Sequence, residues 1–148
     1  MHDNQAIFFM GIDLGTGGAR AVVCDHKGKV QALTDRPLIN GTVLDLPSSY
    51  HEQQVDSWWE AVVMVIRQVL EELGRKNFHP KSIIAIGVTS TSGTILPMDK
   101  DNIPLYPAMM YNDNRAIVEA DLINQFAQEF NQKHGRLFNP SYALAKIL

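Results

Sequence analysis

The sequence predicts an α/β fold in which helices flank a mixed sheet. Two observations lead to this prediction. Three short apolar segments separated by turns open the chain over residues 7–37, which favours an antiparallel start to the sheet. A helical apolar pattern over residues 58–73 then precedes another apolar strand at 83–88, and such a helix is the usual crossover between strands of one sheet.

The opening strands are predicted from apolar runs and from the turns that separate them. Residues 7–12 form an apolar run, and residues 13–18 form a glycine-rich turn that leads into a second strand at 19–24. A polar turn at 25–29 precedes a third strand at 30–37. We therefore expect three antiparallel strands, followed by a loop over residues 40–54, where no sustained period is found.

A long helix is predicted next, and its first residue is indicated by a cap. Asp56 or Ser57 is the expected cap, and Ser57 forms a capping box with Glu60 three residues later. Gly74 is the expected end. The apolar stripe, in which we expect both tryptophans to pack in the core, consists of Trp58, Trp59, Val62, Val63, Ile66, Val69, Leu70 and Leu73.

The second half of the chain continues the alternation of predicted strands and helices. The wholly apolar run at 83–88 predicts a strand buried on both faces. A hydroxyl-rich loop at 89–93, a short strand at 94–98 and a turn at 99–102 follow. Apolar residues at helical spacing from Ile117 to Phe130 predict a second helix that ends near Gly135, and residues 142–148 begin another helix.

Composition excludes several classes of protein. The 148 residues are 45% hydrophobic and 20% charged, with a formal net charge of -3, so clustered positive charge for nucleic acid or an anionic membrane is not expected. Cys24 is the single cysteine and excludes an internal disulfide. The polar residues 1–5 do not resemble a signal peptide, and no segment is apolar enough to span a membrane. A reducing cytoplasm is the expected location.

A glycine-rich turn between two strands is the strongest local signal. Gly15, Thr16, Gly17 and Gly18 would expose N–H groups to an anion at close range, Asp13 could hold a magnesium ion, and Arg20 adds positive charge. The segment is not a P-loop, because no Gly-Lys-Ser/Thr follows, and it is not a dinucleotide fingerprint, because a strand follows it. An ordinary hairpin remains an alternative.

Two further segments could bind a polyol. Thr91, Ser92 and Gly93 follow a predicted strand, and ligands favour the carboxyl ends of strands in α/β sheets. Asn112 and Asp113, close to Arg115, offer a carboxamide and a carboxylate for hydroxyl groups. The alternatives are a solvated turn for the first segment and a helix cap at Asp113 or Asn114 for the second.

The order of these motifs resembles the FGGY carbohydrate kinases over nearly the whole chain. The motifs are Asp13-Leu14-Gly15-Thr16, His51-Glu52-Gln53-Gln54 before Trp58-Trp59, Ile84-Ala85-Ile86-Gly87-Val88-Thr89, Pro104-Leu105, Asn112-Asp113-Asn114-Arg115 and Ala145-Lys146-Ile147-Leu148. The resemblance implies a ribonuclease-H-like fold of the actin, sugar kinase and Hsp70 type. It further implies that residues 1–148 are a truncated amino-terminal kinase domain without the carboxy-terminal nucleotide-binding domain.

The resemblance also implies roles for residues. Asp13 would be the magnesium-associated carboxylate, Gly15, Thr16, Gly17 and Gly18 the first phosphate loop, and Arg20 an arginine near the phosphates. The residues expected to bind the sugar are Thr91, Ser92, Gly93, Asn112 and Asp113. The general base would be an aspartate beyond residue 148, so the fragment alone is expected to be inactive.

Differences from two subgroups point to the substrate. Ser92-Gly93 stands where glycerol kinases have Arg-Glu and many bacterial xylulokinases have Met-His, and Ser141 stands where glycerol kinases direct a tyrosine at their substrate. The chain looks more like the xylulokinase-like and D-ribulose kinase branch. This resemblance implies ATP- and magnesium-dependent phosphorylation of a ketopentose, D-ribulose before D-xylulose. A non-catalytic sugar- or nucleotide-binding module, an actin-like polymerising protein and a homodimer are left open.

Overall fold

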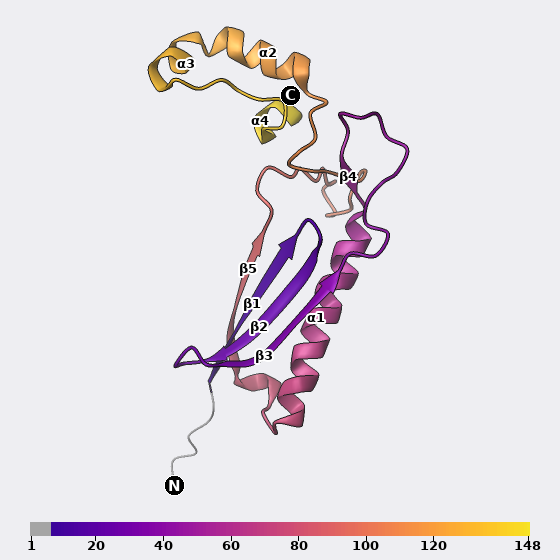
Figure 1. Ribbon diagram of the computed structural model, residues 1–148, viewed down its shortest axis with the longest axis vertical. Coiled ribbons are helices and arrows are strands. Elements are labelled where there is room, and N and C mark those ends of the chain that lie inside the picture. Colours follow the sequence, from indigo (N-terminus) through magenta and orange to yellow (C-terminus); the bar gives the residue numbers. More distant parts are fainter. Residues whose placement is uncertain (1–6) are drawn as a thin grey trace. The chain divides into compact units, whose positions relative to one another are not determined.

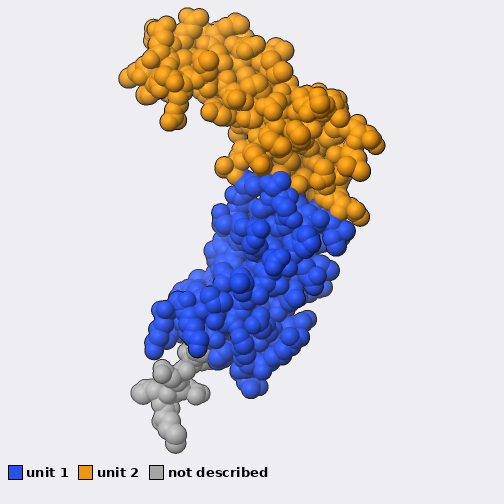
Figure 2. All heavy atoms as spheres, viewed as in Figure 1, with its two compact units in different colours: residues 1–39, 56–91 blue, residues 40–55, 92–148 orange. Residues whose placement is uncertain are grey.

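The chain forms two compact units in the computed structural model, which describes residues 7–148. The polar segment at 1–5 therefore lies outside the described residues. Unit 1 consists of the chain up to residue 39 together with residues 56–91, and unit 2 consists of residues 40–55 and 92–148 (Figure 2).

A four-stranded mixed sheet forms unit 1. It contains β1 (Phe8–Gly15), β2 (Gly18–Asp25), β3 (Val30–Pro37) and β5 (Ile83–Ser90), in the order β3-β2-β1-β5 (Figure 1). The pairs β1–β2 and β2–β3 are antiparallel, and β5 is parallel to β1. The predicted α/β fold and the three antiparallel opening strands are confirmed.

Helix α1 (Val55–Arg75) covers one face of this sheet. It connects β3 to β5 through the short 3-10 helix η1 (Pro80–Ser82). Alternate strand residues bury their side chains against it, as expected for a sheet with a core on one face. The core consists of Phe8, Met10, Ile12, Ala19, Ala21, Val23 and Ala32 from the strands and Ala61, Val65, Val69 and Leu73 from α1.

The start of α1 differs from the prediction. The helix begins at Val55, so Asp56 and Ser57 lie in its first turn and do not cap it. A carboxylate in the first turn is still favourable, because the helix dipole is positive there. The prediction that Trp59 packs in the core is wrong, since its side chain is 71% exposed. Residue 59 lies about 200° around the helix from Ala61, which belongs to the buried stripe.

Strand β5 is also more exposed than its apolar sequence predicts. Ile84, Ile86 and Val88 are 61%, 60% and 72% exposed, so the expected burial on both faces is wrong for the described chain. The strand lies at the edge of the sheet, and the core under α1 is built from β1, β2 and β3, with only Ile83 of β5 packed against it. Apolar composition therefore identified the strand but not its burial.

The early part of unit 2 contains a small sheet that the sequence did not predict. Strands β4 (Glu52–Gln53) and β6 (Ala108–Met109) pair antiparallel. Strand β4 falls in the predicted loop, because two residues are too few to show alternation. The strand predicted at 94–98 is wrong, since isolated bridges at Ile95 and Met98 take its place. The turn at 99–102 is confirmed by the bond from the Asn102 N–H to the Asp99 carbonyl.

The second predicted helix is broken in two. Helix α2 (Ile117–Phe126) and helix α3 (Gln128–His134) meet at Ala127, and the predicted end at Gly135 is confirmed by its left-handed conformation. The Asn124 side chain bonds both the N–H and the carbonyl of Phe138, which requires the chain after α3 to return to α2. A short helix α4 (Ala143–Lys146) ends the unit. Within residues 7–148, no helix combines the length and the apolar character that crossing a membrane requires.

Candidate functional site

The first group of predicted site residues lies at the β1–β2 hairpin of unit 1. The register pairs Gly15 with Gly18, so Thr16 and Gly17 form the turn, and Asp13 and Arg20 are cross-strand partners. Arg20 Nη1 donates to Asp13 Oδ2 over 3.1 Å. The antiparallel register alone therefore brings the predicted carboxylate and arginine together. We call Asp13, residues 15–18 and Arg20 the hairpin cluster.

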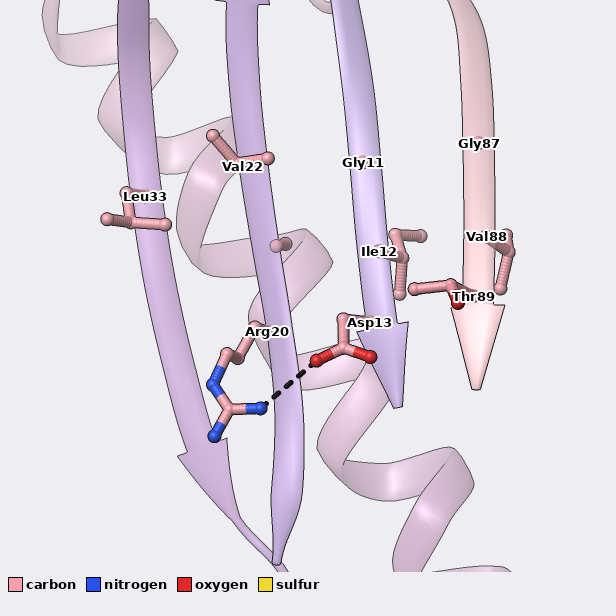
Figure 3. A pocket seen from close by; sticks show the side chains of 10 residues that line it. Gly11, Ile12, Asp13, Arg20, Val22, Leu33, Gly87, Val88 and Thr89 are labelled. Atoms are coloured by element: carbon pink, nitrogen blue, oxygen red, sulfur yellow. Dashed lines mark hydrogen bonds and ion pairs between the residues drawn. The ribbon is translucent and has the colours of Figure 1, made fainter. Parts of the chain in front are cut away.

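The carboxylate of the hairpin cluster is accessible. The Asp13 and Arg20 side chains are 44% and 60% exposed, and they lie at one end of an open hollow of about 520 Å³ on the sheet face (Figure 3). The apolar part of the hollow includes Val22, Leu33 and Val88. A single exposed carboxylate can bind a magnesium ion that keeps most of its water, so Asp13 is compatible with this role.

The glycines of the hairpin provide space. The positive φ angles among described glycines belong to Gly28, Gly93 and Gly135, so the hairpin does not depend on left-handed backbone. A Cβ at Gly18 would lie 2.2 Å from the Arg36 carbonyl oxygen on β3, whereas a Cβ at Gly17 would meet nothing within 4 Å. Gly18 therefore allows β2 and β3 to pack closely, and Gly17 leaves the turn open to a ligand.

The second group of site residues surrounds a buried carboxylate in unit 2. Asp113 is 0% exposed, and its Oδ2 accepts the His51 N–H over 2.8 Å. The Arg115 guanidinium donates to both carboxylate oxygens through Nε, and its Nη2 lies 2.6 Å from Asp113 Oδ2 and 2.6 Å from Glu52 Oε1. Arg115 also stacks 3.9 Å from the ring centre of Tyr50. We call Tyr50, Glu52, Asp113 and Arg115 the acid–arginine cluster.

The charges in this cluster stabilise one another. Burial by itself would raise the pKa of Asp113, but hydrogen bonds from Arg115 and from the His51 N–H outweigh burial and hold the pKa below its ordinary value of 3.8. The hydrogen bond to Asp113 raises the pKa of Arg115 against the opposing effect of burial, and Glu52 adds to the increase. Asp113 and Arg115 are therefore both ionised at neutral pH, and their hydrogen bonds stabilise the chain around residues 50–53 and 113–115.

The alternative of a helix cap at Asp113 or Asn114 is wrong. Helix α2 begins at Ile117, and its cap residue Ala116 offers no side-chain hydrogen bond. Asp113 instead binds Arg115, and Asn114 donates from its side chain to the Asn112 carbonyl. Asn112 itself is exposed, whereas Asp113 is enclosed by its own partners. Direct contact of Asp113 with a ligand therefore stays a prediction.

The predicted hydroxyl-rich loop is divided between the two units. Thr91 closes unit 1, and Ser92 and Gly93 open the second segment of unit 2. Gly93 has a φ of 76°, and a Cβ there would lie 3.6 Å from Tyr111 Cβ, so the loop packs beside the segment that carries Asn112. Lys146 donates to the Gly93 carbonyl over 3.2 Å. Sequence reasoning gave no role to Tyr50 or to the Lys146 side chain, because their partners Arg115, Gly93 and Met110 lie 36 to 65 residues away in the sequence.

A family model matches residues 8–148, and its description is "FGGY family of carbohydrate kinases, N-terminal domain". A D-ribulokinase of Saccharomyces cerevisiae is 30% identical over 121 residues, which are 80% of this chain and 16% of that protein. A xylulose kinase of Escherichia coli is 26% identical over 95% of this chain and 27% of its own length. A glycerol kinase of Aquifex aeolicus is 25% identical over 92% of this chain and 26% of its own length.

Solved structures show the same fold. The xylulose kinase of Rhodospirillum rubrum superimposes with a TM-score of 0.77 at 22% identity, over 95% of this chain and 28% of that chain. The Plasmodium falciparum glycerol kinase with ADP gives a TM-score of 0.74 at 18% identity, over 96% of this chain and 28% of that chain. This chain spans 16% to 27% of the length of the curated relatives named above.

Proposed function

The chain belongs to the FGGY family of carbohydrate kinases, whose N-terminal domain matches residues 8–148, and from this we propose that the full-length protein uses ATP to phosphorylate a small sugar. Because the chain spans only 16% to 27% of its curated relatives, the proposal concerns the complete gene product. The fragment of 148 residues is proposed to be inactive alone, since the general base is expected beyond residue 148.

The hairpin cluster is the observation that carries this proposal. Asp13 and Arg20 lie opposite each other on the surface beside a turn at which Gly17 leaves open space. Asp13 would hold magnesium, which neutralises charge that develops on the phosphoryl oxygens. The N–H groups of residues 15–18 and the Arg20 guanidinium would bind phosphate oxygens. An anion could approach the main chain here without displacing any side chain at Gly17.

We propose a ketopentose as the sugar, with D-ribulose before D-xylulose. Support comes from Ser92-Gly93 and from the segment 110–115, in which the chain looks like the D-ribulose kinase branch. The D-ribulokinase of Saccharomyces cerevisiae is 30% identical, although glycerol and xylulose kinases match at 25% and 26%. Since these identities are close, the choice of sugar rests on the residues of the loop.

In this proposal the sugar-binding residues divide into two roles. Ser92 and Asn112 are exposed, so the hydroxyl and the carboxamide are available to sugar hydroxyls. Contacts of the sugar with Thr91 and with the Gly93 backbone are part of the same proposal. Asp113 is buried and bonded to Arg115, so it acts indirectly, by fixing the position of the 112–115 segment. Direct contact between Asp113 and the sugar would require this cluster to open.

A coupled assay of the full-length gene product tests the function. Magnesium-ATP is supplied with D-ribulose, D-xylulose, L-ribulose or glycerol, and Asp13→Ala is compared with Glu60→Ala, which removes an exposed carboxylate from α1 of the same unit. We expect D-ribulose to give the highest kcat/KM and only Asp13→Ala to abolish turnover. A preference for glycerol would refute the proposed sugar. Sugar binding without phosphorylation would support a non-catalytic module instead.

A further inference from the structure

Lys146 joins two segments that are far apart in the sequence. Its Nζ donates to the Gly93 carbonyl over 3.2 Å and to the Met110 carbonyl over 2.5 Å. These acceptors lie 53 and 36 residues before the lysine, and all three residues belong to unit 2. The ammonium group therefore crosslinks the loop at Gly93 to the end of β6.

The Met110 carbonyl also helps to fix the backbone of the acid–arginine cluster. It also accepts the Asp113 N–H over 3.0 Å, while the Met110 N–H donates to the His51 carbonyl over 2.8 Å. Met110 is only 3% exposed, so its backbone has little freedom. A group that binds this carbonyl and the Gly93 carbonyl together fixes the loop relative to the segment that carries Asn112 and Asp113.

The environment of Lys146 differs from that of an ordinary surface lysine. Such a lysine keeps its ammonium group in water, whereas Lys146 is partly buried and gives both of these bonds to the main chain. Burial lowers the pKa of Lys146, and the nearby Asp113 charge opposes this effect while Arg115 adds to it. Ordering a lysine side chain is unfavourable by about 2 kcal/mol of conformational entropy. Such a bridge therefore persists where its hydrogen bonds offset that loss.

We propose that Lys146 is a positioning residue that holds the loop at Ser92 and Gly93 against the 110–113 segment. That this loop binds a sugar rests on the function proposed above. Lys146 does not touch the sugar in this account. It acts through the Gly93 backbone, which has a left-handed conformation at φ 76°.

The experiment uses the full-length protein with Lys146→Met, which keeps most of the length of the side chain and removes the charge and the donor. Lys146→Arg is the conservative variant, and Lys133→Met is the matched control because it removes an exposed lysine from α3. Amide hydrogen exchange is measured over residues 92–95 and 110–113, and KM is measured separately for the sugar and for ATP.

We expect Lys146→Met to accelerate exchange in both segments, and to raise the sugar KM, by about tenfold or more, as for a lost charged hydrogen bond. The KM for ATP should change less than about twofold, Lys146→Arg should restore part of the sugar KM, and Lys133→Met should resemble the wild type. Unchanged exchange would overturn the positioning role even if the protein is a sugar kinase. Faster exchange with an unchanged sugar KM would refute the link to sugar binding.

The two proposals can fail separately. If the wild type phosphorylates no sugar, the proposed function fails, and the exchange measurement still decides whether Lys146 fixes the loop. If Lys146→Met does not fold, the comparison uses Lys146→Gln, whose side chain is shorter and carries no charge. A Lys146→Gln protein with wild-type exchange and wild-type sugar KM would then contradict the proposal.

Discussion

Adjacent glycines in the β1–β2 hairpin are predicted to respond in opposite ways to the same substitution. In Gly18→Ala, the added Cβ would lie 2.2 Å from the Arg36 carbonyl oxygen and 3.0 Å from Pro37 Cα. Both atoms belong to the β3 backbone and cannot rotate away. In Gly17→Ala, the added Cβ meets nothing within 4 Å. The pair therefore separates a packing role from a role in ligand binding.

The structure sets the expected size of the effect of Gly18→Ala. To restore an ordinary contact, β2 and β3 must separate locally by about 1 Å, which strains the core and stretches neighbouring ladder bonds. Overpacking is unfavourable by about 1–3 kcal/mol, and a weakened ladder bond adds about 1 kcal/mol. A loss of about 3 kcal/mol corresponds to a decrease in the thermal midpoint of roughly 6–12 °C for a domain of about 150–250 residues, and to a smaller decrease in a longer cooperative unit. For Gly17→Ala we expect a change within about 0.5 kcal/mol.

Thermal unfolding of the two variants, followed by circular dichroism, tests this difference in the full-length protein. ATP titrations then test the proposed phosphate loop: the methyl group of Gly17→Ala occupies the space that the phosphates need, so the KM for ATP should rise by about tenfold at little change in stability. If Gly18→Ala is as stable as Gly17→Ala, the packing argument is wrong. If Gly17→Ala leaves the KM for ATP unchanged, phosphate does not approach this turn.

Three other predictions concern unit 2 and α1. Because the pKa of Asp113 lies below 3.8 in the folded state, the stability that its ionised form provides is present above that value and is lost as pH falls through the folded pKa. The stability difference between the wild type and Asp113→Asn, measured by urea unfolding, should therefore shrink between about pH 6 and about pH 3, and a constant difference would contradict this. Gly93→Val should raise the sugar KM and lower stability by about 1–3 kcal/mol, because a β-branched residue is strained at φ 76°, and a neutral result would contradict the observed backbone. Trp59→Ser should alter the thermal midpoint by less than about 2 °C, because the ring is 71% exposed, and a larger decrease would mean that it is covered in the full-length protein.

The unequal success of the sequence reasoning at the candidate site has a physical cause. Asp13 and Arg20 were brought together by a hairpin, whose partners are fixed by strand alternation and a short turn. Asp113 was recognised as a candidate, yet its burial was not, since His51, whose N–H binds it, and Glu52, which binds its partner Arg115, lie 62 and 61 residues before it in the chain. The break at Ala127 was missed for the same reason, because Phe138 pairs with Asn124 only after the chain has turned back.

The sequence by itself determined the strands over 8–37, the long helix, the parallel strand that follows it and the family to which the chain belongs. These features depend on local periodicity, on turn residues and on the order of short motifs, all of which can be read along the chain. Only the tertiary structure decided which apolar residues are covered, as the exposed Ile84, Ile86 and Val88 show. It also decided where the Lys146 ammonium group binds. Burial and long-range hydrogen bonds depend on which segments meet in space, and spacing in the sequence does not fix that.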